Sequence, residues 1–139
     1  MADSTGINRW TGKALTDRDH VVQSLLVIFT TFFGTRIMRW WFGSNVAPIL
    51  GRENVTPSTF IRFFSAIGSA LVWEPRVSLI QITFLGNQDD LRLGKAAFLL
   101  NLQYRPRGHL GDFTPAGARR VTVSLTKTTV GTNVQVLPA

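Results

Sequence analysis

The hydrophobic period of the chain changes at Pro75, and this change constrains the fold more than any other feature of the sequence. Before Pro75, apolar residues recur every three or four positions, which places them on one side of a helix. After it, apolar residues occupy alternate positions from Ala96 to Tyr104, as on one face of a strand. Because proline disfavours helical geometry in the residue before it, the helix must end there. The sequence therefore predicts an α+β domain with helices first and strands after.

Two main helices are expected before Pro75. The first has Thr16 as its N-cap, and we expect it to end at Gly34 and to be followed by one short helical turn over residues 35–41. The second has Thr56 as its N-cap and Pro57 at the first helical position, where a missing N–H is harmless. Its predicted buried stripe consists of Phe60, Phe63, Phe64, Ile67 and Leu71.

The second half of the chain is expected to form a small sheet. The predicted strands are residues 77–85, 95–104 and 119–127. They indicate a three- to four-stranded antiparallel or mixed sheet, with an extended arm at each end of the chain. The predicted organisation is an N-terminal arm over 1–15, a single α+β domain over 16–127 and a C-terminal tail over 128–139. The tail is either a fourth strand of the same sheet, a frayed terminus or a strand donated to another chain.

The composition indicates a globular protein that contacts other chains. Hydrophobic residues make up 45% of the 139 residues and charged residues 17%, which is unlike a disordered chain. Ten Phe and four Trp exceed what one small core needs, so we expect part of this apolar surface to meet partners. The absence of cysteine excludes a disulfide, and two histidines give few ligands for a metal. No cofactor and no metal are expected.

The acidic residues do not form a recognisable catalytic pair. Four of the eight acidic residues are explained by a helix start or a turn, namely Asp17, Asp19, Asp89 and Asp90. A glycosidase needs two carboxyl groups about 5–10 Å apart, and nothing in the sequence pairs Glu74 with Glu53. There is no Gly-x-Ser-x-Gly elbow, and neither histidine has an evident acidic partner. We therefore expect no enzymatic activity and no catalytic residue.

The net charge of +7 leaves a nucleic-acid-binding module as a rival interpretation. Twelve of the fifteen basic residues are Arg, but they are spread along the chain, and Arg is also favoured at protein interfaces. A cell-wall hydrolase is the second rival. The most apolar run, residues 25–33, is shorter than the ~20 residues that cross a bilayer, and the start lacks a signal-peptide pattern. We expect neither membrane insertion nor direct nucleic-acid binding.

Five short motifs occur in order along the chain: Thr11-Gly12-Lys13, Val22-Gln23-Ser24-Leu25, Gly34-Thr35-Arg36 with Met38-Arg39, Phe42-Gly43-Ser44 and Glu74-Pro75-Arg76. In this combination, over about residues 8 to 105, the chain resembles the baseplate wedge and sheath-initiator family of contractile phage tails. This is the family of baseplate assembly protein W, historically also labelled lysozyme-related. The resemblance implies an α+β fold and a structural, non-enzymatic role in the baseplate of a virion, assembled in the host cytoplasm.

The same resemblance implies the partners. Multiple copies, with sixfold symmetry expected, would form a ring around the tail tube and hold the core bundle of other wedge proteins. The ring would present a surface on which the first ring of sheath protein assembles. Tail tube and hub proteins are further candidate partners.

Three sets of residues are candidate contacts with these partners. Glu74, Pro75 and Arg76 are expected to project from a rigid corner toward a wedge protein, the alternative being a simple helix stop. Arg36, Arg39, Trp40 and Trp41 form the second set, because two adjacent Trp cannot both face inward from one helical turn. The third set is a strand edge within residues 119–137, offered to the sheath: Val121, Val123, Leu125, Val134 and Val136.

Overall fold

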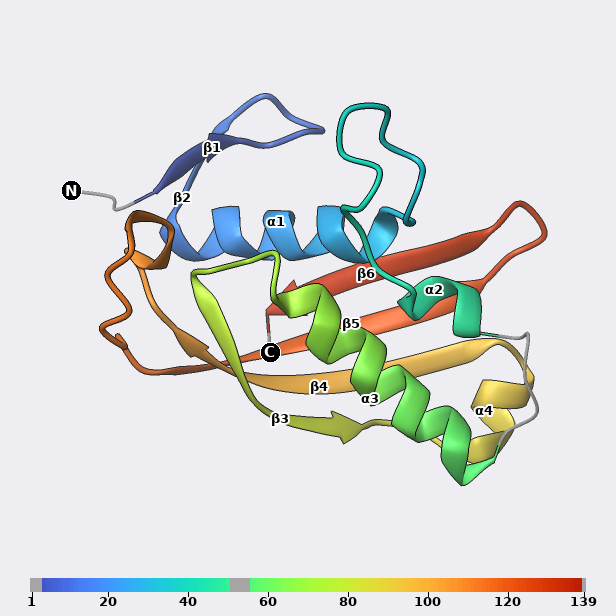
Figure 1. Ribbon diagram of the computed structural model, residues 1–139. Helices are drawn as coiled ribbons and strands as arrows, with labels where there is room; N and C mark the ends of the chain where they lie inside the picture. Colours follow the sequence, from blue (N-terminus) through green and yellow to red (C-terminus); the bar gives the residue numbers. More distant parts are fainter. Residues whose placement is uncertain (1–3, 51–55, 139) are drawn as a thin grey trace.

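The computed structural model describes residues 4–50 and 56–138, in which two long helices lie on one face of a four-stranded sheet (Figure 1). The sheet contains β3 (Val77–Phe84), β4 (Lys95–Tyr104), β5 (Ala118–Lys127) and β6 (Thr132–Pro138). They are hydrogen-bonded in the order β3-β4-β5-β6, and every neighbouring pair is antiparallel. The predicted α+β class and the three predicted strands are confirmed.

Alternation along the strands sets which face of the sheet is buried. In β4 the side chains of Ala96, Phe98, Leu100 and Leu102 are at most 4% exposed. Their counterparts on β5 are in register with them, since Phe98 lies opposite Val123 and Leu100 opposite Val121. The predicted apolar faces of these two strands therefore meet in one core under the helices.

The second predicted helix is α3 (Pro57–Leu71), and its start is as expected, with Thr56 as the N-cap and Pro57 at the first position. Its apolar stripe packs on the sheet, where the Phe63 ring lies 5.2 Å from the Phe98 ring. Phe64 was expected in the core but is 37% exposed at the margin of the stripe. Residues Val72–Trp73 follow the helix and lead into the corner at Pro75.

The first helix, α1 (Asp17–Thr30), begins after Thr16 as predicted but ends before Gly34. The hydroxyls of Thr30 and Thr31 donate to Leu26 O and Val27 O, and Thr31 is already extended. The short helical turn predicted over residues 35–41 is wrong, because this stretch consists of bends and turns. Two short helices were not predicted: α2 (Val46–Ile49) and α4 (Gln88–Arg92).

The predicted N-terminal arm is folded in its described part. Its strands β1 (Thr5–Ile7) and β2 (Ala14–Thr16) form an antiparallel hairpin that lies along α1 (Figure 1). Gln23 on α1 holds the hairpin turn, since its side chain accepts from Arg9 N–H and donates to Ile7 O. A Cβ on Gly6 would lie 2.6 Å from the His20 ring, so the hairpin packs closely on the helix.

The C-terminal tail is β6, the fourth strand of the sheet, which was one of the alternatives left open. Residues 132–138 pair with β5 from Thr132 opposite Lys127 to Pro138 opposite Val121. The side chains of Val134 and Val136 are buried beneath α1. The boundary expected at residue 128 therefore falls inside a hairpin of the same sheet.

Candidate functional site

The corner after α3 holds a buried ion pair between Glu74 and Arg76. Arg76 Nε donates to Glu74 Oε1 at 2.7 Å, and Arg76 Nη2 donates to Oε2 at 2.8 Å. Their side chains are 3% and 8% exposed. Pro75 between them fixes the backbone so that both side chains reach the same side. The expectation that these charges project outward is corrected, because each satisfies the other within the chain.

The remaining nitrogen of the guanidinium ties the corner to the N-terminal half of the chain. Arg76 Nη1 donates to Ser4 Oγ at 2.9 Å and to His20 Nδ1 at 3.0 Å. A guanidinium can only donate, so Nδ1 of His20 is an acceptor and the ring proton lies on Nε2. Residues from the hairpin, α1 and the corner thus share one polar network.

The protonation states in this network favour the charged pair. Burial raises the pKa of Glu74, but hydrogen bonds from Arg76 and Ser24 outweigh it and leave that pKa below its ordinary value. Burial, and then the charge of Arg76, lowers the pKa of His20. Glu74 is therefore ionised at neutral pH, whereas the general acid of a glycosidase must have a raised pKa. Glu53, the other acid considered, lies outside the described residues.

Gly108 packs directly against the backbone of the corner. The short 3-10 helix η1 (Gly108–Leu110) lies so close that a Cβ on Gly108 would be 2.2 Å from Pro75 O. Arg105 N–H also donates to Arg76 O at 2.8 Å. The backbone of the corner is thus fixed by the segment that follows β4, a contact that no local sequence pattern predicts.

Residues 32–42 form an exposed loop rich in aromatic residues, the aromatic loop. Its base is closed by Ser44 N–H, which donates to Thr31 O at 2.9 Å. Trp40 and Trp41 are 64% and 49% exposed and lie edge to face. Both predicted cations lie over one ring, with the guanidinium carbons of Arg36 and Arg39 at 4.7 and 5.4 Å from the centre of Phe42. The two arginines of the second predicted set are thus brought together by stacking on Phe42 and not by helical spacing, whereas its two tryptophans contact each other.

The third predicted set, the apolar residues of the strand edge, has its side chains inside the protein and not on a surface that a partner could contact. Val121, Val123, Leu125, Val134 and Val136 are all buried in the core. Moreover, β5 has β4 on one side and β6 on the other, so it offers no edge. Within the described residues, the available edge on this side of the sheet belongs to β6.

The hydrogen-bonding direction along β6 follows from its hairpin. Thr128 and Gly131 exchange both backbone N–H···O bonds. Hydrogen-bonded and non-hydrogen-bonded pairs alternate in an antiparallel ladder, and the register runs on without a break from this pair. Asn133, Gln135 and Leu137 therefore bond to β5. The N–H and C=O groups of Thr132, Val134 and Val136 point away from the sheet.

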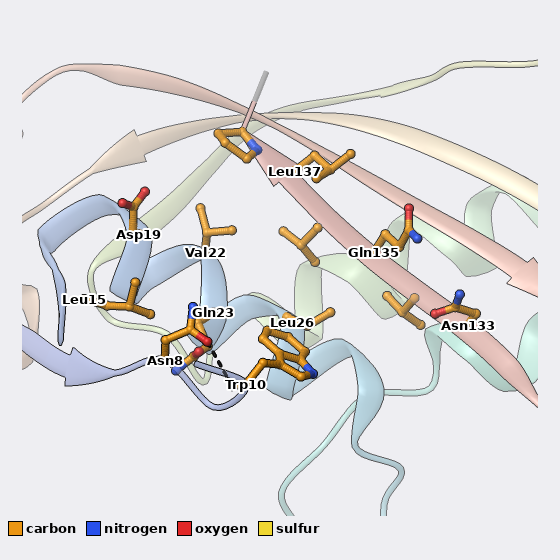
Figure 2. Close-up of a pocket in the computed structure, with 13 residues that line it drawn as sticks. Asn8, Trp10, Leu15, Asp19, Val22, Gln23, Leu26, Asn133, Gln135 and Leu137 are labelled. Carbon is orange, nitrogen blue, oxygen red and sulfur yellow. Dashed lines mark hydrogen bonds between the residues drawn. The ribbon is translucent and has the colours of Figure 1, made fainter. Parts of the chain in front are cut away.

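A groove of about 660 Å³ runs along this edge, and we call it the β6 groove (Figure 2). Figure 2 shows β6 on one side and α1 with the hairpin turn on the other. The indole of Trp10 lies beside Leu26, toward the Asn133 end, and Asp19 lies toward the opposite end. The full lining is Asn8, Trp10, Leu15, Asp19, Val22, Gln23, Leu26 and residues 133–138.

The corner at Pro75 and the aromatic loop adjoin one another. The Phe42 ring packs on Trp73, which precedes Glu74 in the chain, so the aromatic loop is anchored at the corner. The groove runs along the edge of the sheet, and an adjoining hollow lined by Arg36 connects it to the aromatic loop. Sequence reasoning missed Ser4, His20 and Trp10, and the exposed Trp10 in a turn was the one signal that could have pointed to the groove.

Similarity to known proteins shows the family of the chain. No protein-family model matches the sequence. Baseplate protein W of Escherichia phage P2 is 37% identical over 79 residues, which are 56% of this chain and 68% of that protein. The chain belongs to the baseplate protein W family. This W-family protein is accordingly a component of a contractile-tail baseplate, and the family expected from its motifs is confirmed.

Two solved structures resemble the W-family protein. A chain in the cryo-electron microscopy structure of the post-contraction baseplate of pyocin R2 has a TM-score of 0.61 and 26% identity, covering 73% of this chain and 99% of that one. A crystal structure of a putative tail lysozyme from Geobacter sulfurreducens has a TM-score of 0.54 and 19% identity, covering 90% of this chain and 91% of that one. The second likeness, at 19% identity, shows the fold alone.

Within residues 4–50 and 56–138 there is no group of three or more His, Asp or Glu side chains placed to hold a metal ion. None of the described helices has both the length and the apolar character to cross a membrane.

Proposed function

We propose that the chain joins the wedge core bundle to the tube-proximal ring of the baseplate and initiates the sheath by offering the edge of β6 to the first sheath ring. The observation that carries this proposal is the open edge of β6 beside an apolar groove, in a member of the baseplate protein W family. An unpaired edge recruits an extended segment through main-chain hydrogen bonds.

The edge is suited to pairing with another chain. Val134 and Val136 each present an N–H and a C=O outward, while their side chains stay in the core. A partner strand would therefore bond to β6 without displacing any residue of this chain. The sheet would grow from four strands to five, and one face of the new strand would lie against α1 and Trp10.

The aromatic loop and the corner are the surface that we assign to the wedge core bundle. Ile37, Met38, Trp40 and Trp41 are exposed together with Arg39, and aromatic residues, Met and Arg are enriched at protein interfaces. The buried Glu74–Arg76 pair acts through geometry, since it holds the corner on which Phe42 and hence the loop are seated. Contact of the two charges with a partner remains a prediction.

Replacing Val136 with proline tests the role of the edge. Proline removes one outward N–H and places a ring where the partner strand would lie, but it leaves the bonds to β5 intact. Particles that carry Val136→Pro should assemble baseplates and tubes without sheaths, as seen by electron microscopy. Sheaths of normal number and length would contradict the proposal.

The matched control is Gln135→Pro, one residue earlier. The Gln135 N–H bonds to β5, so this change breaks the ladder of the chain itself and should lower its stability in urea denaturation. Val136→Pro should unfold at a denaturant concentration between those of Gln135→Pro and the wild type, because it keeps the bonds to β5 but alters a buried side chain. Deletion of residues 128–139 would not separate these effects, because it also removes the core side chains of Val134 and Val136.

A further inference from the structure

The two ends of the β6 groove differ in charge. At the Asn133 end, Arg9 and Arg36 line a hollow that is continuous with the groove through Trp10, Leu26 and Val134. Asp19 lies two helical turns before Leu26 on α1, about 10 Å along the helix, at the opposite end (Figure 2). The groove is therefore basic at the start of β6 and acidic toward its end.

These charges are available for a ligand. All three side chains are exposed, and none of them forms an ion pair with another described residue. Arg9 is held over the Trp10 ring at 5.2 Å and Arg36 over the Phe42 ring at 4.7 Å. Stacking of this kind restricts a guanidinium and leaves its N–H groups free to bind a carboxylate.

We propose that the β6 groove selects the direction and the charge order of the strand that it binds. The strand runs antiparallel to β6, with a basic residue before, and an acidic residue after, a pair of apolar residues at alternate positions. The inference rests on the proposed function, since it describes the strand that would be added to β6.

The register follows from the outward groups of β6. An added strand bonds to Val136 and Val134, so the two residues opposite them have side chains on the same face as these valines. On that face the added strand would lie against α1 and Trp10. Because the groove lining there is largely apolar, apolar side chains of the strand would pack well against it. Residues at the positions between point to the open face of the sheet, where polar side chains are suitable.

The charge order follows from the same register. In an antiparallel strand, the residue two positions before the apolar pair lies opposite Pro138, toward Asp19. The residue two positions after the pair lies opposite Thr132, toward Arg9 and Arg36. Antiparallel pairing is the mode of every strand pair in this sheet, and it is slightly more stable per residue than parallel pairing.

Two capped peptides with the same composition and opposite order test the inference. Acetyl-KTVTVTE-amide has the proposed order and acetyl-ETVTVTK-amide has the reverse, so neither composition nor net charge can explain a difference. Each is titrated into the isotope-labelled full chain, and the amide signals of Thr132, Val134 and Val136 are followed by NMR. We expect KTVTVTE to bind about fivefold more tightly at low salt, with the difference shrinking in 1 M salt.

A charge-reversed protein provides the second arm. Arg9→Glu, Arg36→Glu and Asp19→Lys together should invert the preference to ETVTVTK, because these side chains are exposed and lie outside the core. Equal binding of both peptides to the wild-type chain, a preference for ETVTVTK, or no shift at the three amides would overturn the inference. Failure of the proposed function would be recognised separately, as normal sheaths on particles that carry Val136→Pro.

Discussion

The ring of Phe42 packs against the ring of Trp73 with their centroids 5.3 Å apart. Trp73 immediately precedes Glu74, so the anchor of the aromatic loop and the buried ion pair share one turn of backbone. Arg36 and Arg39 lie over the same Phe42 ring. A change in the corner is therefore transmitted to the exposed loop through one aromatic contact, and the loop and corner should be tested together.

The buried ion pair should be more costly to break than to remove. Arg76→Met leaves the Glu74 carboxylate buried without its partner and should lower the free energy of unfolding by about 3–5 kcal/mol. Glu74→Leu combined with Arg76→Met should recover much of this loss, since no buried charge remains. Urea denaturation measures both. The exposed Asp89–Arg92 pair is the control, and Arg92→Ala should change stability by at most about 1 kcal/mol.

The stability of the chain should fall as the pH is lowered from 7.5 to 5.5. The folded-state pKa of His20 lies below its ordinary value of 6.5, because of burial and the nearby Arg76. Below pH 6.5 the unfolded chain therefore binds a proton more readily than the folded chain does. His20→Gln should flatten the slope of unfolding free energy against pH in this range. An unchanged slope in His20→Gln would show that another group is responsible.

A second, more acidic loss of stability should come from Glu74. Its folded-state pKa is lowered from 4.5, because hydrogen bonds to Arg76 and Ser24 outweigh the effect of burial. The stabilisation is present above that ordinary value and is lost as the pH falls through the lower, folded-state pKa. Thermal unfolding followed from pH 5 to pH 2 should show this loss in the wild-type chain. The double variant Glu74→Leu, Arg76→Met should not show it.

Gly108 should tolerate no side chain. A Cβ at this position would lie 2.2 Å from Pro75 O, and both partners are backbone, so the corner must shift. Gly108→Ala should therefore lower the unfolding free energy by more than about 1 kcal/mol. Gly68→Ala, within α3 and with open space around its Cβ, is the contrasting substitution and should raise stability by about 0.5–1 kcal/mol. Denaturant midpoints of the two variants should move in opposite directions.

The exposed tryptophans should matter for assembly and not for folding. Trp40→Ser and Trp41→Ser should each change stability by less than about 0.5 kcal/mol, because neither side chain is in the core. We expect both changes to reduce incorporation of the chain into baseplates, measured by quantitative immunoblotting of purified particles. Phe42→Ala should instead lower stability by about 3 kcal/mol, since Phe42 is buried. Normal incorporation of the Trp40→Ser, Trp41→Ser double variant would remove the aromatic loop from the interface.

Local patterns were enough to predict the two long helices and three of the four strands of the main sheet. The caps at Thr16 and Thr56 and the alternation in β4 are properties of neighbouring residues, and the structure has these elements where they were expected. The end of α1 was mispredicted because it depends on a distant residue. Thr31 O accepts a hydrogen bond from Ser44 N–H, which is not part of the helix. No pattern among the neighbouring residues predicts this contact.

The site could be predicted only in part for the same reason. Sequence identified Glu74, Arg76 and the two tryptophans, but the direction of each side chain depends on tertiary partners. Arg76 points inward because Ser4, 72 positions away, and His20 accept its remaining hydrogen bonds. The strand edge was expected somewhere within residues 119–137, and it belongs to β6 because residues 132–138 pair with β5 and cover it.

The uncovered edge of β6 has a consequence for the subunit before assembly. Two copies could pair edge to edge through the same outward groups that would receive a partner strand. The net charge of +7 opposes such an encounter by mutual repulsion, which acts over about 10 Å at 0.1 M salt. Colloidal stability of the free subunit therefore depends on ionic strength, and storage in dilute buffer should keep it monomeric where concentrated salt promotes precipitation.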